Sequence, residues 1–234
     1  MKDLTPTGKL RVGVNLSNFL LVQRNPDGSV RGIVPDLAQE LARRIGATPP
    51  QLVLYEKVGD VAEGAKKGAW DVAFIGAEPQ RAADIDFTDP YVEIEATYLV
   101  PAGSPIKALA DVDRKGVRIA VSDRSAYDLW LTRNLQHAEL RRVEGIAASY
   151  DLFVKEGLEV LAGLKPRLLE DVQKLPGARI LEGKFTAVQQ AIGTPKGRPE
   201  GYAYLRRFAA DVRSSGLVAR LIERHGIKGL SVAA

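Results

Sequence analysis

The sequence predicts an α/β protein in which parallel strands alternate with helices and the chain is organised as two lobes. Three observations predict this class. Short apolar runs alternate with amphipathic stretches along most of the chain. Two long extended runs, residues 92–100 and 185–193, are each followed by a Gly- and Pro-rich break. The segment between them has the composition of a complete small α/β unit.

The first part of the chain predicts strands and helices in strict alternation. Strands are expected at residues 10–14, 51–55 and 71–75, and helices at residues 35–45 and 58–67. The helix over 35–45 is supported by Leu37, Leu41 and Ile45, whose four-residue spacing places them on one face. Pro35 suits its first turn and Gly46 its end. This order favours a parallel sheet covered by helices on both faces.

The alternation restarts after residue 105 and ends in two helices. Strands are expected at residues 117–121, 140–143, 158–162 and 178–181. Helices are expected at residues 125–134, 146–155, 166–174, 200–214 and 217–225. The simplest architecture places residues 1–97 and 191–234 in one lobe and inserts residues 98–190 as the second. Two crossing strands then form a hinge with the ligand in the cleft, although a single continuous α/β domain fits the same pattern.

Composition excludes several classes of function. The 234 residues include 33 Lys and Arg and 29 Asp and Glu, a net charge of +4, and the basic clusters are only dipeptides. Nucleic-acid binding requires a continuous basic stripe, so we expect none. The chain has no Cys, and its two His lack metal-ligand spacing, so we expect no metal and no cofactor.

Location is predicted less directly. No apolar run is long enough to span a membrane. The first residues lack the apolar core of a secretory signal. We therefore expect either a cytoplasmic protein or one whose signal was removed and replaced by Met1.

Residues 70–91 (WDVAFIGAEPQRAADIDFTDPY) contain the strongest candidate for a binding residue. An apolar strand ends near Gly76, and Arg81 follows in a short turn. Ligands of open α/β sheets bind beyond the carboxyl ends of the strands. A guanidinium there pairs two nitrogens with two carboxylate oxygens. An ordinary surface charge is the alternative for Arg81.

The same segment resembles the signature of the periplasmic solute-binding proteins of ABC importers, in the polar-amino-acid-binding family (family 3, type II periplasmic binding fold). The matching residues are Asp71-Val72, the Pro79-Gln80-Arg81 turn, and residues 87–91 (FTDPY). Residues 8–14, 32–38 and 116–121 resemble the opening strand, the first helix and a second-lobe strand of that family. The resemblance covers nearly the whole chain and implies the two-lobed fold with a hinge.

The resemblance implies specific ligand contacts. Arg81 would clamp a ligand carboxylate, assisted by the backbone N–H of Gly76. In the second lobe, residues 122–127 (SDRSAY) match a loop that offers the N–H groups at a helix start to the same carboxylate, with Ser122 and Ser125 as contacts. Helix N-termini carry unsatisfied donors and a partial positive charge, which supports this independently. Ser125 as a plain helix cap is the alternative.

Aromatic side chains are also expected to contact the ligand. Phe19 follows the first strand, where the family places residues that sandwich the ligand, and a core phenylalanine is its alternative. Phe74 and Tyr127 are further candidates.

The chain departs from the family where amino-acid binders hold the ligand amine. An aspartate normally ends the matching second-lobe strand, but here Leu164 occupies that position and Lys165 follows. Leucine cannot neutralise an ammonium group. Either Glu78, otherwise a solvent-exposed turn residue, supplies the negative charge, or the ligand lacks an amine and Lys165 or Arg167 meets a second acidic group.

The expected function is therefore capture of a small carboxylate-bearing solute by a periplasmic monomer that delivers it to the membrane permease of an ABC importer. Two alternatives stay open. One is an enzyme resembling cyclohexadienyl dehydratases, which needs a positioned carboxyl group to protonate a leaving hydroxyl. The second-lobe strand end offers no such acid. The other is a sensory ligand-binding module that reuses this fold.

Overall fold

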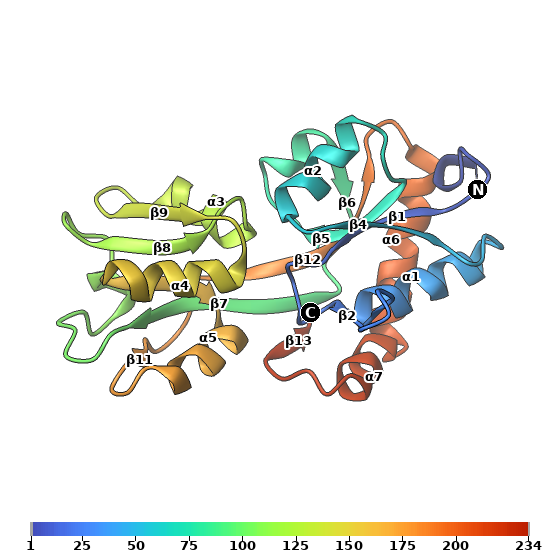
Figure 1. Cartoon of the computed structure of the whole chain (residues 1–234). Helices are drawn as coiled ribbons and strands as arrows, with labels where there is room; N and C mark the ends of the chain where they lie inside the picture. Colours follow the sequence, from blue (N-terminus) through green and yellow to red (C-terminus); the bar gives the residue numbers. More distant parts are fainter. Residues whose placement is uncertain (1, 234) are drawn as a thin grey trace. The chain divides into compact units, whose positions relative to one another are not determined.

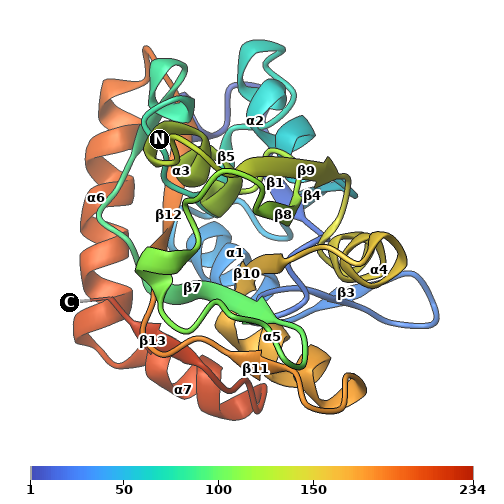
Figure 2. The same ribbon diagram turned by 90° about the vertical axis from the view of Figure 1, so that its left-hand side faces the viewer.

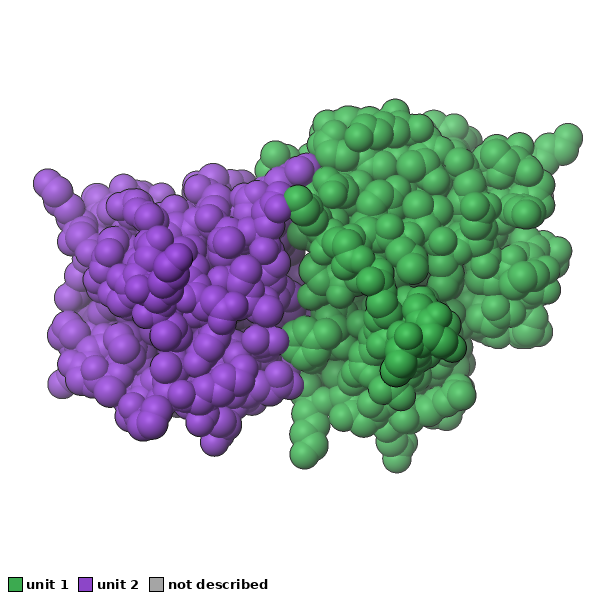
Figure 3. Space-filling model, viewed as in Figure 1, with its two compact units in different colours: residues 1–93, 189–234 green, residues 94–188 purple. Residues whose placement is uncertain are grey.

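The computed structural model describes residues 2–233 and divides into two compact units. Unit 1 comprises Met1–Glu93 and Gln189–Ala234, and unit 2 comprises Ile94–Val188 (Figure 3). The chain passes from one unit to the other within β7 (Val92–Val100) and returns within β12 (Thr186–Pro195). Both connections are therefore continuous strands.

Unit 1 is built on three parallel strands followed by an antiparallel one. The order is β4 (Gln51–Tyr55), β1 (Arg11–Asn15), β5 (Val72–Gly76) and β12. The strands β4, β1 and β5 are parallel, with Val14 opposite both Leu54 and Phe74. β12 runs antiparallel to β5 and also pairs with β6 (Ile85–Phe87).

Helices cover the unit 1 sheet on both faces, and β5 is therefore buried along its whole length. On one face α2 (Val58–Lys66) packs through Val61 against Ile75 and Trp70, whose indole nitrogen donates to the Val61 carbonyl at 2.9 Å. The other helices of this unit are α1 (Ile33–Arg44), α6 (Pro199–Ser214) and α7 (Leu217–Arg224) (Figure 1).

Unit 2 repeats this plan. The strand order is β9 (Glu139–Val143), β8 (Arg118–Ser122), β10 (Val160–Leu164) and β7. The first three are parallel and β7 is antiparallel to β10. α4 (Ile146–Glu156) packs on the sheet through Phe153, and Figure 2 shows α3 (Ala126–Asn134) on the other side of the strands. α5 (Lys165–Asp171) follows β10, and β11 (Arg179–Ile180) pairs with β7.

An arginine–carboxylate pair at the start of the central strand is common to both units. In unit 1, Arg11 donates through its backbone N–H, Nε and Nη2 to the carboxylate of Asp71, and Arg198 adds a contact at 2.9 Å. In unit 2, Arg118 donates through the same three groups to Glu159. Each arginine thereby links the start of the central strand, β1 or β8, to the residue that precedes the next parallel strand, β5 or β10.

The strands and helices predicted from the sequence are confirmed within a few residues, but the bounds of two strands differ, and the short strands β6 and β13 (Leu230–Val232) were not predicted. β10 starts later than expected and reaches Leu164, and β12 continues through Pro195, where a break was expected. The short hairpin of β2 (Gln23–Arg24) and β3 (Val30–Arg31) was not predicted, although its Pro-Asp-Gly turn at residues 26–28 signals one.

The remaining elements are short. They are β13 (Leu230–Val232) and the 3-10 turns at Lys2–Leu4, Arg81–Ala83, Leu109–Asp111 and Val172–Lys174. Within residues 2–233, none of the helices combines the length and the apolar character needed to cross a bilayer.

Candidate functional site

The predicted site residues lie at the carboxyl ends of parallel strands in each unit. Gly76 ends β5 in unit 1, and Arg81 follows it in a 3-10 turn. In unit 2, Ser122 ends β8 and Leu164 ends the neighbouring strand β10. The carboxyl edge is where open α/β sheets bind ligands, so each unit presents candidate contacts at that edge.

Arg81 is held against the end of β5 and is only 6% exposed. Its Nη1 donates to the Gly76 carbonyl at 2.7 Å, and its backbone N–H donates to the Glu78 carbonyl at 2.9 Å. The guanidinium is therefore fixed by the turn that carries it and does not extend into bulk solvent. A buried, oriented guanidinium at this edge is suited to bind a carboxylate.

The other unit 1 candidates differ in how far they are buried. Glu78 and Phe19 are half-buried, and Phe74 is a core residue that packs edge-on against Tyr91 with ring centroids 5.7 Å apart. Phe74 is therefore occupied by packing. Contacts from Phe19, Glu78 and the Gly76 N–H to a ligand stay predictions.

Asn18 is a candidate that the sequence interpretation missed. It lies in the loop after β1, its backbone carbonyl accepts from the N–H groups of Leu21 and Val22, and the residue is 6% exposed. Its buried Oδ1 has no hydrogen-bond partner among the described residues. Such an atom costs free energy unless water or a ligand satisfies it. The sequence signal that could have identified Asn18 is its place directly before the apolar run of residues 19–22.

In unit 2, Ser125 caps α3, as the sequence predicted. Its hydroxyl oxygen accepts from the Asp128 N–H at 3.1 Å, and its own N–H donates to the Ser122 carbonyl at 3.2 Å. Both serines are buried, at 4% exposure for Ser122 and 6% for Ser125. The cap confirms the position of the helix start, whereas ligand contact by the two serines stays a prediction.

Tyr127 lies in the first turn of α3 and is 2% exposed. Its Oη is buried without a hydrogen-bond partner among the described residues. Burial raises the pKa of Tyr127 to about 12, and the Ser125 and Ser122 side chains and the charge of Arg167 act in the opposite direction. The phenol is therefore a neutral donor at the start of the helix.

Asp128 stabilises the loop that precedes α3. Its carboxylate accepts from the Arg124 backbone N–H at 2.8 Å and from Arg142 Nε at 2.9 Å. Arg124 adopts a left-handed conformation, with φ 56°. Burial raises the pKa of Asp128, while the Arg124 N–H and the Arg142 charge oppose that shift. Asp128 thereby holds the serine loop in an otherwise unfavourable backbone conformation.

In the structure, β10 ends at Leu164, the position where the resemblance led us to expect an aspartate. Leu164 is 3% exposed, and the Lys165 ammonium lies 2.8 Å from Glu95 on β7. Lys184 is a second cation on Glu95, at 3.3 Å. The hydrogen bonds from Lys165 and then Lys184 hold the pKa of Glu95 below its usual range. Lys165 therefore has an acidic partner within the chain, which the sequence interpretation did not include.

Asp71 illustrates a motif residue with a structural role. It opens the signature segment, yet its carboxylate is fully buried between Arg11 and Arg198. Thr88 in the same signature bonds the backbone of residues 89 and 192. The signature therefore includes residues that hold unit 1 together as well as Arg81.

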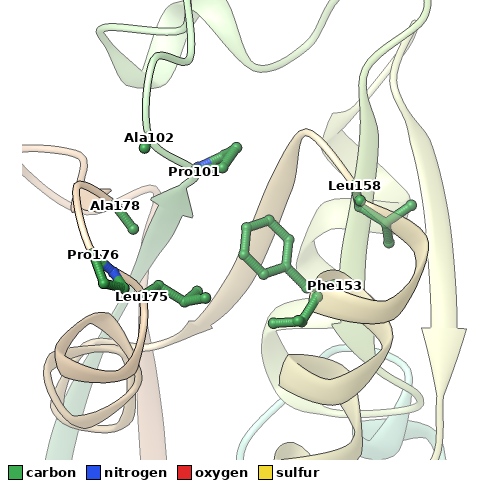
Figure 4. Close-up of a pocket in the computed structure, with 9 residues that line it drawn as sticks. Pro101, Ala102, Phe153, Leu158, Leu175, Pro176 and Ala178 are labelled. Atoms are coloured by element: carbon green, nitrogen blue, oxygen red, sulfur yellow. The ribbon is translucent and has the colours of Figure 1, made fainter.

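A cavity of about 250 Å³ lies in unit 2 at the other end of its sheet. Figure 4 shows Phe153 and Leu158 on one side of it and Leu175, Pro176 and Ala178 on the other. The predicted ligand residues are not among its lining. Its lining is almost entirely apolar, whereas recognition of a charged solute requires convergent polar groups, so we place the candidate site at the carboxyl edges.

A metal site has no support among residues 2–233, where no cluster of three His, Cys, Asp or Glu side chains has the arrangement of a metal site. The candidate edges instead contain arginine, hydroxyl and backbone donors. These groups bind anions through hydrogen bonds.

These features define an α/β fold of two units with candidate anion contacts at the strand ends, as in two-lobed solute-binding proteins. Residues 10–228 match the family model of bacterial extracellular solute-binding proteins, family 3. The chain therefore belongs to that family. A comparison with curated proteins gave no match.

Solved structures of low sequence identity share the fold. The solute receptor for L-cysteine of Neisseria gonorrhoeae is 19% identical, with a TM-score of 0.81 over 97% of this chain and 94% of that one. An L-arginine-bound ABC transporter substrate-binding protein of Streptococcus pneumoniae is 19% identical, with a TM-score of 0.78 over 96% and 97%. An ancestral amino-acid-binding protein described as a precursor of cyclohexadienyl dehydratase is 21% identical, with a TM-score of 0.77 over 95% and 97%.

Proposed function

We propose that this protein is a receptor that captures one small carboxylate-bearing solute, an amino acid or related organic acid, for import by an ABC transporter. The observation that carries the proposal is the buried guanidinium of Arg81 at the carboxyl end of β5. The Arg81 fork can form two charge-assisted hydrogen bonds with one carboxylate.

Unit 2 supports the same proposal. The N-terminus of α3 offers backbone N–H groups and a partial positive charge beside Ser122 and Ser125. We propose that units 1 and 2, with boundaries near the predicted residues 97/98 and 190/191, act as the two lobes and that β7 and β12 act as the hinge. In the liganded state Arg81 and the α3 N-terminus then hold the same carboxylate. Several such bonds, each worth roughly 1.5–3 kcal/mol, are sufficient for micromolar affinity.

We also propose that the protein is a periplasmic monomer that delivers its solute to a membrane permease. The extracellular family and the ABC-transporter name of the similar Streptococcus pneumoniae structure support the location and the transporter. The residues at the end of β10 favour a binding protein over an enzyme. The end of β10 carries Leu164 and Lys165, so it offers no acid to protonate a leaving group.

A thermal-shift screen of amino acids and small carboxylic acids tests the proposal. We expect one class of carboxylates to raise Tm by several degrees and to bind stoichiometrically in calorimetry. Turnover of prephenate would instead support the dehydratase alternative. A screen without any carboxylate-dependent stabilisation would contradict the receptor.

A further inference from the structure

The backbone of Arg124 is unusual for a residue that carries a side chain. Its φ is 56°, and within residues 2–233 it is the one non-glycine residue with a positive φ. This left-handed conformation is unfavourable for an L-residue, because Cβ lies too close to the following carbonyl oxygen. Arg124 belongs to the loop of residues 122–125, which joins β8 to α3. The surrounding structure must therefore hold this loop in place.

Asp128 holds the loop from the first turn of the helix that follows it. Its Oδ2 accepts from the Arg124 N–H at 2.8 Å, and its own N–H donates to Ser125 Oγ at 3.1 Å. The Asp128 residue is 2% exposed. One residue thus bonds two successive loop residues, and the left-handed conformation of Arg124 is the one that allows both bonds.

A neighbouring strand fixes the Asp128 carboxylate in turn. Arg142 on β9 donates from Nε to Asp128 Oδ1 at 2.9 Å and from Nη2 to Thr132 Oγ1 at 2.8 Å. Thr132 Oγ1 donates to the Asp128 carbonyl, also at 2.8 Å. The Asp123 N–H donates to the Val143 carbonyl of β9 at 2.8 Å. Because both oxygens of the carboxylate are engaged, it cannot easily turn away from the Arg124 N–H.

The loop that Asp128 holds carries the anion donors of unit 2. Ala126 and Tyr127 begin α3, so their backbone N–H groups have no acceptor within the helix. The adjacent Ser122 and Ser125 are buried. Tyr127 Oη is buried as well and lacks a hydrogen-bond partner in the described part of the chain. The direction of these donors depends on the backbone of the preceding loop, which includes Arg124.

We propose that Asp128 is a positioning residue for anion binding by unit 2: it keeps Arg124 in the left-handed conformation that directs the donors at the start of α3 toward a ligand carboxylate. Asp128 acts through the backbone and does not touch the carboxylate. This inference rests on the proposed function, because it assumes that the α3 N-terminus binds a carboxylate. It adds a residue on which the affinity of that site depends.

A rescue experiment tests the proposal with four carboxylates: L-norvaline, L-glutamate, L-lysine and pentanoate. In Asp128→Ala the loop should leave the competent conformation for part of the time, and the apparent affinity falls by that fraction. The cost of a left-handed residue corresponds to an affinity loss of about 5-fold to 30-fold. Glycine adopts a positive φ without this cost. Arg124→Gly in the Asp128→Ala background should therefore recover most of the affinity, with Arg124→Gly alone as the reference.

Two further variants complete the design. Arg142→Ala removes the tether of the carboxylate but leaves Asp128 in place, so it protects the fold, and it should weaken binding by a smaller factor that Arg124→Gly also restores. Asp113→Ala is the matched control. Its carboxylate accepts from the N–H groups of residues 136–138, beyond the other end of α3. Asp113→Ala should affect stability and leave affinity unchanged.

Calorimetry on the full chain measures the affinities, and circular dichroism verifies that each variant is folded. Wild-type affinity in folded Asp128→Ala and Arg142→Ala proteins would overturn the positioning role and leave the receptor function intact. An affinity loss that Arg124→Gly does not restore would overturn it too, because Asp128 would then act by another route. Failure of the unsubstituted protein to bind any of the four carboxylates would count against both proposals.

Discussion

At the scale of single residues, the charged side chains divide by what surrounds them. Arg81 and Asp71 belong to the same signature segment and are both buried. Asp71 is enclosed by two arginines, whereas Arg81 contacts the last carbonyl of β5 at the carboxyl edge of the sheet. The two motif residues therefore differ in what surrounds them. We expect substitution of Arg81 to reduce binding and substitution of Asp71 to reduce stability.

Replacement of Arg81 by Ala should abolish carboxylate binding and leave the protein folded. The substitution removes charge-assisted hydrogen bonds, so we expect affinity to fall by a factor of about 100 or more. Calorimetry measures the affinity and circular dichroism the fold. Arg206→Ala on the exposed surface of α6 is the matched control. Undiminished affinity in the folded Arg81 variant would contradict the site.

Replacement of Asp71 by Asn should destabilise the protein by about 3–5 kcal/mol, because it leaves two arginines without their buried counter-charge. Glu159→Gln removes the equivalent carboxylate of unit 2, whose side chain is 35% exposed, and should cost less than about 1 kcal/mol. Urea unfolding measures both. Equal costs would mean that burial does not distinguish the two pairs.

Replacement of Leu164 by Asp should shift selectivity toward amino acids, because it restores an acid at the end of β10. The ratio of L-norvaline to pentanoate affinity is the measurement, and an increase of about 10-fold is expected from one charged contact. An unchanged ratio would mean that this strand end does not face the ligand.

At the scale of elements, the start of one helix lies at the candidate site, whereas the surface of another contributes ion pairs to stability. α3 begins at a serine cap whose hydroxyl satisfies the Asp128 N–H, and α1 carries Glu40 beside Arg43 and Arg44. The first arrangement lies at the candidate site. The second lies on a helix surface and affects stability alone.

The α1 ion pairs predict a pH dependence of stability. Hydrogen bonding from Arg43, then Arg44, lowers the pKa of Glu40 from 4.5 to about 2. A lowered folded-state pKa stabilises the protein above pH 4.5, and this contribution is lost as the pH falls toward 2. Glu40→Gln should therefore lower the free energy of unfolding by about 0.3–1 kcal/mol at pH 7, and this effect should shrink below pH 4.5 and disappear as the pH falls through 2. A difference independent of pH would refute this assignment.

At the scale of the whole molecule, two units share one plan: three parallel strands, an antiparallel fourth, and an arginine–carboxylate pair at the start of the central strand. Each unit has its own core cluster, around Trp70 in unit 1 and Phe153 in unit 2. A ligand that contacts both units stabilises the chain as a whole.

Ligand at 100 times its Kd should add about 2.7 kcal/mol to the free energy of unfolding. Hydrogen exchange should then slow in residues 76–81 of unit 1 and in residues 122–128 of unit 2. Protection confined to one unit would mean that the other contributes no contact.

The sequence by itself determined the alternation of strands and helices, the cap of α3 and the position of Arg81, because periodicity, capping and turn chemistry are local properties. The roles of Asp71, Glu95 and Tyr127 were decided only by the tertiary structure. Asp71 meets Arg11 across 60 residues and Glu95 meets Lys165 across 70. Burial and ion pairing between such distant residues depend on strand order and register, which no local pattern encodes.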